Sequence, residues 1–103
     1  MDEKFFENFC YKATEKWGEE SQLRMCIEEM SELTKEICKY MRIVKDHETS
    51  SEEDLMRIKN NIIEETADVL NCATQMALIF GKEKVDEIRE YKVKRCIDKH
   101  FDK

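Results

Sequence analysis

The sequence predicts an all-α protein. It holds no proline and only two glycines in 103 residues, and its apolar residues recur at helical spacing. Helices are favoured because proline and glycine are the residues that interrupt them most strongly. Helices joined by short loops pack as antiparallel bundles. We therefore expect an antiparallel four-helix bundle, formed by residues 1–103 as a single domain.

Gly18 separates the first two predicted helices. The first covers about residues 2–17, because a glycine commonly follows a helix end. Ser21 is predicted to be the N-cap of a long second helix. The apolar positions are Phe5, Phe6, Phe9, Ala13 and Trp17 in the first helix and Leu23, Cys26, Met30, Leu33, Ile37, Met41 and Val44 in the second.

The polar stretch at residues 45–50 is predicted to be a loop before the third helix. Ser50 with Glu53, or Ser51 with Asp54, would begin that helix with a capping box. The third helix ends at Gly81, and a fourth covers about residues 82–100. Their apolar positions are Leu55, Ile58, Ile62, Val69, Ala73, Met76 and Phe80, then Val85, Ile88, Tyr91, Cys96 and Ile97.

The five cysteines, at positions 10, 26, 38, 72 and 96, contain no C-x-x-C pair. Their odd number and wide spacing are unlike a disulfide framework or a thiolate zinc site. We expect buried thiols that act as small apolar residues in a reducing compartment. No run approaches the roughly 20 apolar residues of a transmembrane helix, and no secretory signal begins the sequence. A cytoplasmic protein without membrane contact is expected.

The net charge of −6 argues against a nucleic-acid partner, because phosphate backbones bind net-positive surfaces. A nucleotide remains compatible with this charge if cations accompany it. A chain of this length buries only about 60–65% of its unfolded surface, so its core is thin. The thin core favours self-association as a homodimer or homotetramer.

Two seven-residue segments share one pattern of acids. Residues 27–33 read IEEMSEL and residues 63–69 read IEETADV, each near the middle of a long predicted helix. At about 100° per residue, Glu29 and Glu65 fall at the edge of the apolar stripe. Glu28 and Glu64 lie farther toward solvent. The acids one turn apart are Glu29 with Glu32 and Glu65 with Asp68.

If the second and third helices pack antiparallel, these acid pairs converge. Carboxylates at such short distances repel one another, and a divalent cation binds between them because it offsets this repulsion. Oxygen ligands without histidine or thiolate suit Mg²⁺, Mn²⁺ or Ca²⁺. A di-iron site needs Glu-x-x-His, and neither His47 nor His100 follows a glutamate by three residues. One segment alone would be surface charge, whereas two copies on partner helices favour a metal site.

These paired motifs resemble those of the MazG-type all-α nucleoside triphosphate pyrophosphohydrolases, which include dimeric dUTPases. EExxE on one helix is followed by ExxD on the next, and the resemblance covers roughly residues 17–98. The short format is similar to that of small phage- or bacterial-type members. The resemblance implies that Glu29, Glu32, Glu65 and Asp68 bind Mg²⁺, with Mn²⁺ as a substitute.

The resemblance also implies the other site residues. Glu28 and Glu64 match the leading acids, which would hold water or act as the general base. The residues implied to bind substrate are Lys92 and Arg95, with Lys94 beside them, and Asn71, Trp17 and Gln22. For Trp17, a core or interface position is favoured over a base-stacking role. The basic residues of the fourth helix also complement its dipole.

The implied reaction is Mg²⁺-dependent hydrolysis of a (d)NTP to the nucleoside monophosphate and pyrophosphate by a metal-activated water. The implied assembly is an interlocked dimer or tetramer with the active site near the subunit interface. A P-loop enzyme is excluded because no Gly-rich phosphate loop is present. Two alternatives stay open: a non-catalytic helical dimerisation or regulatory module with surface acids, and a nucleotide-binding protein without turnover.

Overall fold

The computed structural model describes residues 1–45 and 51–101, and the regular structure in these ranges is entirely helical. The helices are α1 (Glu3–Trp17), α2 (Glu19–Lys45), α3 (Glu52–Phe80) and α4 (Lys82–His100). The predicted all-α class is confirmed. None of these four helices is both long enough and apolar enough to cross a membrane.

Local capping residues and glycines determine most helix ends at the positions that the sequence predicts. Asp2 caps α1 by accepting a hydrogen bond from a first-turn N–H at 3.0 Å. Ser51, the second of the two predicted caps, accepts from the backbone N–H of Asp54 at 3.1 Å. Gly18 and Gly81 follow α1 and α3 with φ values of 89° and 140°. Glycine takes such positive φ values without a Cβ clash.

Two predictions at helix ends differ from the structure. Ser21 is not the N-cap of α2, because the helix begins at Glu19, directly after Gly18. Gly18 alone interrupts the helix, so no further linker residue is needed between α1 and α2. The loop was predicted at residues 45–50. Lys45 is instead the last residue of α2, and residues 46–50 lie outside the described residues.

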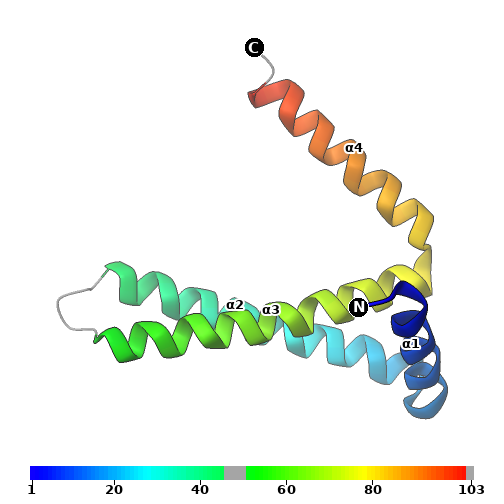
Figure 1. The fold of residues 1–103 in the computed structure, drawn as a ribbon, viewed down its shortest axis with the longest axis horizontal. Helices are drawn as coiled ribbons and strands as arrows, with labels where there is room; N and C mark the ends of the chain where they lie inside the picture. Colours follow the sequence, from blue (N-terminus) through cyan, green and yellow to red (C-terminus); the bar gives the residue numbers. More distant parts are fainter. Residues whose placement is uncertain (46–50, 102–103) are drawn as a thin grey trace.

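The largest helix interface joins α2 and α3, which lie side by side as the chain turns back on itself (Figure 1). Helix α1 packs against both near one end. The core is thin and rich in small side chains. In the described ranges its buried apolar residues are Phe6, Cys10, Ala13, Cys26, Ile58, Cys72 and Ala77. Cys38 and Cys96 are exposed, so burial was predicted correctly for three cysteines and wrongly for two.

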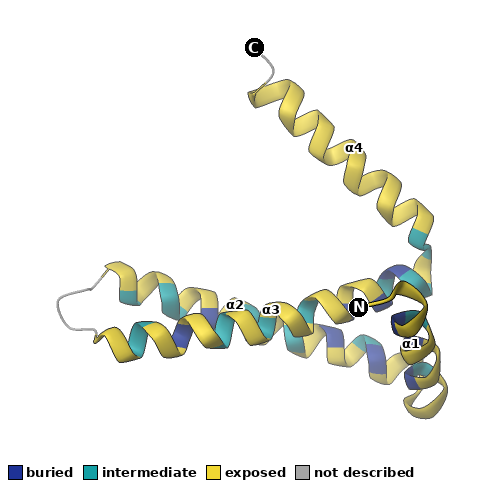
Figure 2. Cartoon of the chain, viewed as in Figure 1, coloured by how far each residue is buried: buried dark blue, intermediate teal, exposed yellow. Residues whose placement is uncertain are grey.

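Helix α4 does not close a four-helix bundle within the chain. It contacts α3 and, through an ion pair between its first residue Lys82 and Glu3, the start of α1. The rest of the helix extends away from the others (Figure 1). Figure 2 shows it exposed almost throughout, and none of its residues is buried. Its predicted core contacts are therefore wrong for the single chain: Val85, Ile88, Tyr91, Cys96 and Ile97 are all exposed. The radius of gyration of 17.5 Å exceeds the ~13 Å of a compact domain of this length.

Polar side chains recur at regular intervals in the α2–α3 interface. On α2 they are Gln22, Glu29 and Glu36, and their partners on α3 are Gln75, Asp68 and Asn61. Each step of seven residues along α2 is matched by a step of seven back along α3. Seven residues are close to two helical turns, so these positions stay on the facing sides. The interface thus has three polar layers, and its middle layer contains acids from both motifs.

Candidate metal centre

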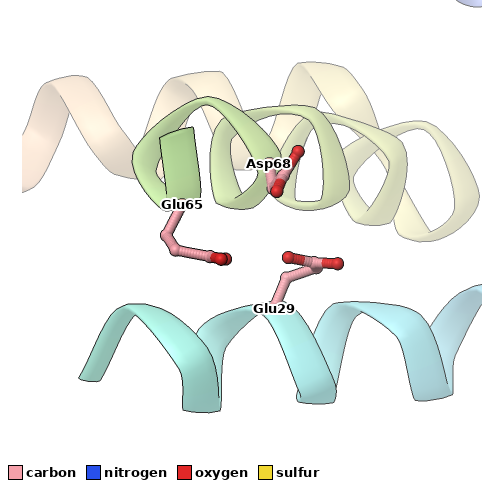
Figure 3. A group of neighbouring side chains, drawn as sticks. All are labelled: Glu29, Glu65 and Asp68. Carbon is pink, nitrogen blue, oxygen red and sulfur yellow. The ribbon is translucent and has the colours of Figure 1, made fainter. Parts of the chain in front are cut away.

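Three carboxylates from the two acidic segments meet in the middle layer. Glu29, Glu65 and Asp68 each offer an oxygen, and these oxygens lie within 4.8 Å of one another. Figure 3 shows Glu29 on α2 and Glu65 on α3 extending into the space between the two helices, with Asp68 on α3 close to Glu29. Glu29 and Glu65 are half-buried and Asp68 is exposed. The interface thereby gathers acids from two helices around one point.

The electrostatics of this carboxylate group favour a bound cation. The pKa of Glu29 is raised to about 7, first by burial, then by Glu65, with which it can share a proton, and by the charge of Asp68. No Lys or Arg in the described ranges forms an ion pair with these three acids. Oε2 of Glu65 is buried without a hydrogen-bond partner. A divalent cation would satisfy this oxygen and relieve the repulsion.

The neighbouring polar layer shows an acid that the protein itself satisfies. Glu36 is buried, and its two oxygens accept hydrogen bonds from Lys39 Nζ at 3.5 Å and Asn61 Nδ2 at 3.4 Å. One basic and one amide donor therefore accompany a single carboxylate. The middle layer concentrates three carboxylates, and among the residues that the structure describes no comparable Lys pairs with them.

The donor set suits a hard cation. Mg²⁺ takes oxygen ligands and usually keeps waters or phosphate oxygens in part of its coordination shell. The nearby Cys72 does not suit such a cation as a ligand, because Mg²⁺ takes oxygen ligands. Burial first, then Cys26 and the charges of Glu29 and Asp68, raise the pKa of Cys72 to about 11. An all-oxygen site for Mg²⁺ or Mn²⁺ fits these residues.

A cavity of about 190 Å³ lies beside the carboxylates, among α1, α2 and α3. Five residues predicted for the site line it: Trp17, Gln22, Glu29, Asp68 and Asn71. The cavity thus combines an aromatic wall and amides with two of the three clustered acids. Such a mixture of apolar surface and a few polar groups is typical of small-molecule sites.

Four further residues line the cavity without having been predicted as site residues: Phe9, Met25, Cys72 and Gln75. Gln75 carried a signal in its spacing, because it follows Asp68 by seven residues on the same helix face. Met25 lies one turn before Glu29, and Cys72 lies one turn after Asp68. Phe9 comes from α1, and no periodicity shows how that helix docks on the others.

The other predicted site residues lie outside the carboxylate group and the cavity. Glu28, Glu32 and Glu64 are exposed on α2 and α3. Lys92 and Arg95 are exposed on α4, which provides no residue to the cavity. The Arg95 guanidinium lies over the Tyr91 ring, 5.7 Å from its centroid. The fold of one chain therefore brings together the acids and the aromatic wall, but not the basic pair.

Comparison with known proteins gives no relative. No protein-family model, curated protein or solved structure matches this chain.

Proposed function

We propose that this protein is a Mg²⁺-dependent nucleoside triphosphate pyrophosphohydrolase of the MazG-like type. The main support is the contact between the carboxylate group and a cavity with aromatic and amide walls. One part suits metal-bound phosphates and the other suits a planar base. The charge of −6 agrees with a polyanionic substrate only when cations are bound with it.

Glu29, Glu65 and Asp68 are the proposed metal ligands. Glu32, one turn after Glu29 but outside their group, is the proposed fourth and more weakly held ligand. Bound Mg²⁺ or Mn²⁺ would neutralise phosphate oxygens and lower the pKa of the attacking water. The water oxygen forms a bond to the α-phosphorus as the bond to the bridging oxygen breaks and pyrophosphate leaves. The exposed acids Glu28 and Glu64 are the candidate bases that accept the proton of the water.

We infer that the protein assembles as a homodimer or homotetramer. Met56, Ile63 and Leu70 are spaced seven residues apart on α3, yet are 66%, 66% and 62% exposed. Apolar side chains at this spacing are typical of helices that pack on a further helix. Apolar residues of α4, among them Ile88, are exposed as well. Lys92 and Arg95 would then serve the active site of a neighbouring copy, where they would bind phosphates.

A pyrophosphate-release assay across the canonical and several damaged (d)NTPs tests this function. We expect equal amounts of monophosphate and pyrophosphate, and only with Mg²⁺ or Mn²⁺. Glu29→Gln and Asp68→Asn should abolish release, whereas Glu15→Gln, an exposed acid on α1, should leave it unchanged. Absence of release from every nucleotide would exclude the proposed activity.

A non-catalytic helical dimerisation or regulatory module is the second candidate function, favoured by the exposed apolar residues of α3. In that case Mg²⁺ would not change the melting temperature, and Glu29→Gln would not alter any binding property. Calorimetric titration with Mg²⁺ separates the two functions, because only the proposed enzyme needs a cation between α2 and α3.

A further inference from the structure

Two buried amides meet at the wall of the cavity beside the carboxylates. Gln22 on α2 is 3% exposed and Gln75 on α3 is 5% exposed. Nε2 of Gln75 donates to Oε1 of Gln22 at 3.0 Å and also to the Thr14 hydroxyl at 3.3 Å. Both hydrogens of this amide nitrogen are thereby used. The pair links all three packed helices at this point.

This arrangement fixes how Gln22 presents its amide. Its oxygen is used by Gln75, so its nitrogen is the atom left for another partner. Nε2 of Gln22 is buried and has no hydrogen-bond partner. Buried donors are rarely left unpaired, because desolvating them without a new bond is costly. Since Gln22 lines the cavity, a bound ligand is the natural acceptor for this N–H.

The other walls indicate a flat ligand. Phe9, Trp17 and Met25 provide aromatic and thioether surface on α1 and α2, and Trp17 is half-exposed at 53%. Stacking on aromatic side chains binds nucleobases without selecting among them. A cavity of about 190 Å³ suits a ring system rather than a whole nucleotide. The sugar and phosphates would then extend along Asn71 toward the carboxylates.

We propose that Gln75 is a positioning residue that turns Gln22 into a hydrogen-bond donor. The cavity then selects bases with a carbonyl group at the position where cytosine and adenine carry their amino group. Uracil, thymine, guanine and hypoxanthine carry a carbonyl oxygen where cytosine and adenine carry an amino group. An amino group would face the Gln22 N–H donor to donor and leave both unpaired. This inference rests on the proposed function, whose substrate class it names.

Uridine and cytidine nucleotides test this selectivity, because their bases differ only at one edge. We expect kcat/KM for UTP to exceed that for CTP by at least about tenfold, as expected when a donor has to pair with the base. The fluorescence of Trp17, the only tryptophan, gives a second readout without turnover. UMP should quench it at lower concentration than CMP, with Mg²⁺ present in both titrations.

Gln75→Met tests the positioning role. It removes the donor that holds Gln22 but keeps the side-chain length, so Gln22 can turn either its oxygen or its nitrogen to the base. The ratio of kcat/KM for UTP over CTP should fall to near one, through a rise in CTP use. Asn60→Met, at an exposed amide of α3, is the matched control and should keep the ratio of the unmodified protein.

The outcomes separate this inference from the proposed function. Equal use of UTP and CTP by the unmodified protein overturns the inference and leaves pyrophosphohydrolase activity standing. A ratio unchanged by Gln75→Met overturns the role of Gln75. Preferential quenching by UMP with no hydrolysis of any triphosphate supports the selective pocket and overturns the enzyme. The comparison of substrates needs no variant, so the inference is decided even if Gln75→Met fails to fold.

Discussion

Glu29 and Glu36 lie seven residues apart on one face of α2, yet the charges and donors around them differ. Glu36 has Lys39 and Asn61 as hydrogen-bond donors, whereas Glu29 faces two further acids. The same residue type on the same helix face is therefore satisfied by the protein at one position and left among like charges at the other. The neighbours on α3 make this difference, which is why Glu29 and not Glu36 is the proposed cation ligand.

The raised pKa of Glu29 predicts a pH-dependent stability without metal. The folded-state pKa is about 7, above the ordinary value of 4.5, so the folded protein holds this proton more tightly than the unfolded chain. The stabilisation is complete below the ordinary pKa and is lost as pH rises through about 7. We expect the melting temperature of the metal-free protein to fall between about pH 5 and pH 8, measured by scanning calorimetry.

Mg²⁺ and one variant provide the controls for this pH dependence. Mg²⁺ at the alkaline end should restore the melting temperature, because ligands that bind only the folded state stabilise it. Glu29→Gln should remove both this pH-dependent fall and the Mg²⁺ effect. A melting temperature that does not change across this range in the unmodified protein would contradict the shared proton.

The ligand set gives a second prediction for single residues. Glu65 belongs to the carboxylate group, whereas Glu32 is exposed and one turn away from Glu29. Glu65→Gln should reduce Mg²⁺-dependent kcat/KM by more than about a hundredfold, the upper range for residues that only support metal ligands. Glu32→Gln should cost about tenfold. Equal losses in both variants would place Glu32 on the metal as firmly as Glu65.

At the scale of helices, local signals predicted the boundaries well. Gly81 separates α3 from α4, and the fourth helix has the predicted range because its breaking residue acts without tertiary contacts. Which face each helix buries was harder to predict. The predicted stripe of α2 contained Met30 and Ile37, but both are exposed, and Gln22 and Glu36 are buried instead. Apolar periodicity does not distinguish a face that meets its own chain from one that stays uncovered.

The meeting of acids at the candidate site was predictable from the sequence. A repeated motif on partner helices indicates convergence, and Glu29, Glu65 and Asp68 do meet. The cavity was only partly predictable, because Phe9 reaches it from a helix whose docking depends on tertiary packing. The location of the basic pair was not predictable either, since Lys92 and Arg95 lie on a helix that leaves the other three.

The polar layers predict how the α2–α3 interface responds to substitution. Asn61→Leu leaves one oxygen of the buried Glu36 without its donor and should lower the free energy of unfolding by about 1–3 kcal/mol. Adding Glu36→Leu should recover most of this loss, because two apolar residues replace the polar pair. Urea unfolding at fixed protein concentration measures both effects.

Hydrolysis by the same two proteins is the control for this prediction. The Glu36 layer is separate from the carboxylate group, so the double variant should retain Mg²⁺-dependent activity. If the double variant is less stable than Asn61→Leu alone, the Glu36–Asn61 pair stabilises the interface beyond satisfying a buried charge.

The whole molecule is open and leaves apolar side chains exposed on α3 and α4. Met56, Ile63 and Leu70 form one exposed apolar row on α3, and α4 adds Ile88 and others. Contiguous apolar surface is uncommon on a monomer and usually marks an interface. Since α4 extends away from α2, its basic residues would reach a carboxylate group only in the proposed assembly, from a neighbouring copy.

Mixed assemblies test this exchange of residues between copies. We expect Glu29→Gln to be inactive for lack of a metal ligand, and the double variant Lys92→Ala/Arg95→Ala to be inactive for lack of phosphate contacts. If each active site uses acids of one copy and basic residues of its neighbour, a mixed dimer holds one intact site. Random pairing in a symmetric dimer should then restore about a quarter of the full activity on unfolding and refolding the two variants together. Refolding each variant alone should restore none.

A mixture as inactive as its components would place the basic pair in the site of its own chain, which would require α4 to fold back toward α2. Full activity of the double variant alone would remove Lys92 and Arg95 from the site and leave phosphate binding to the metal.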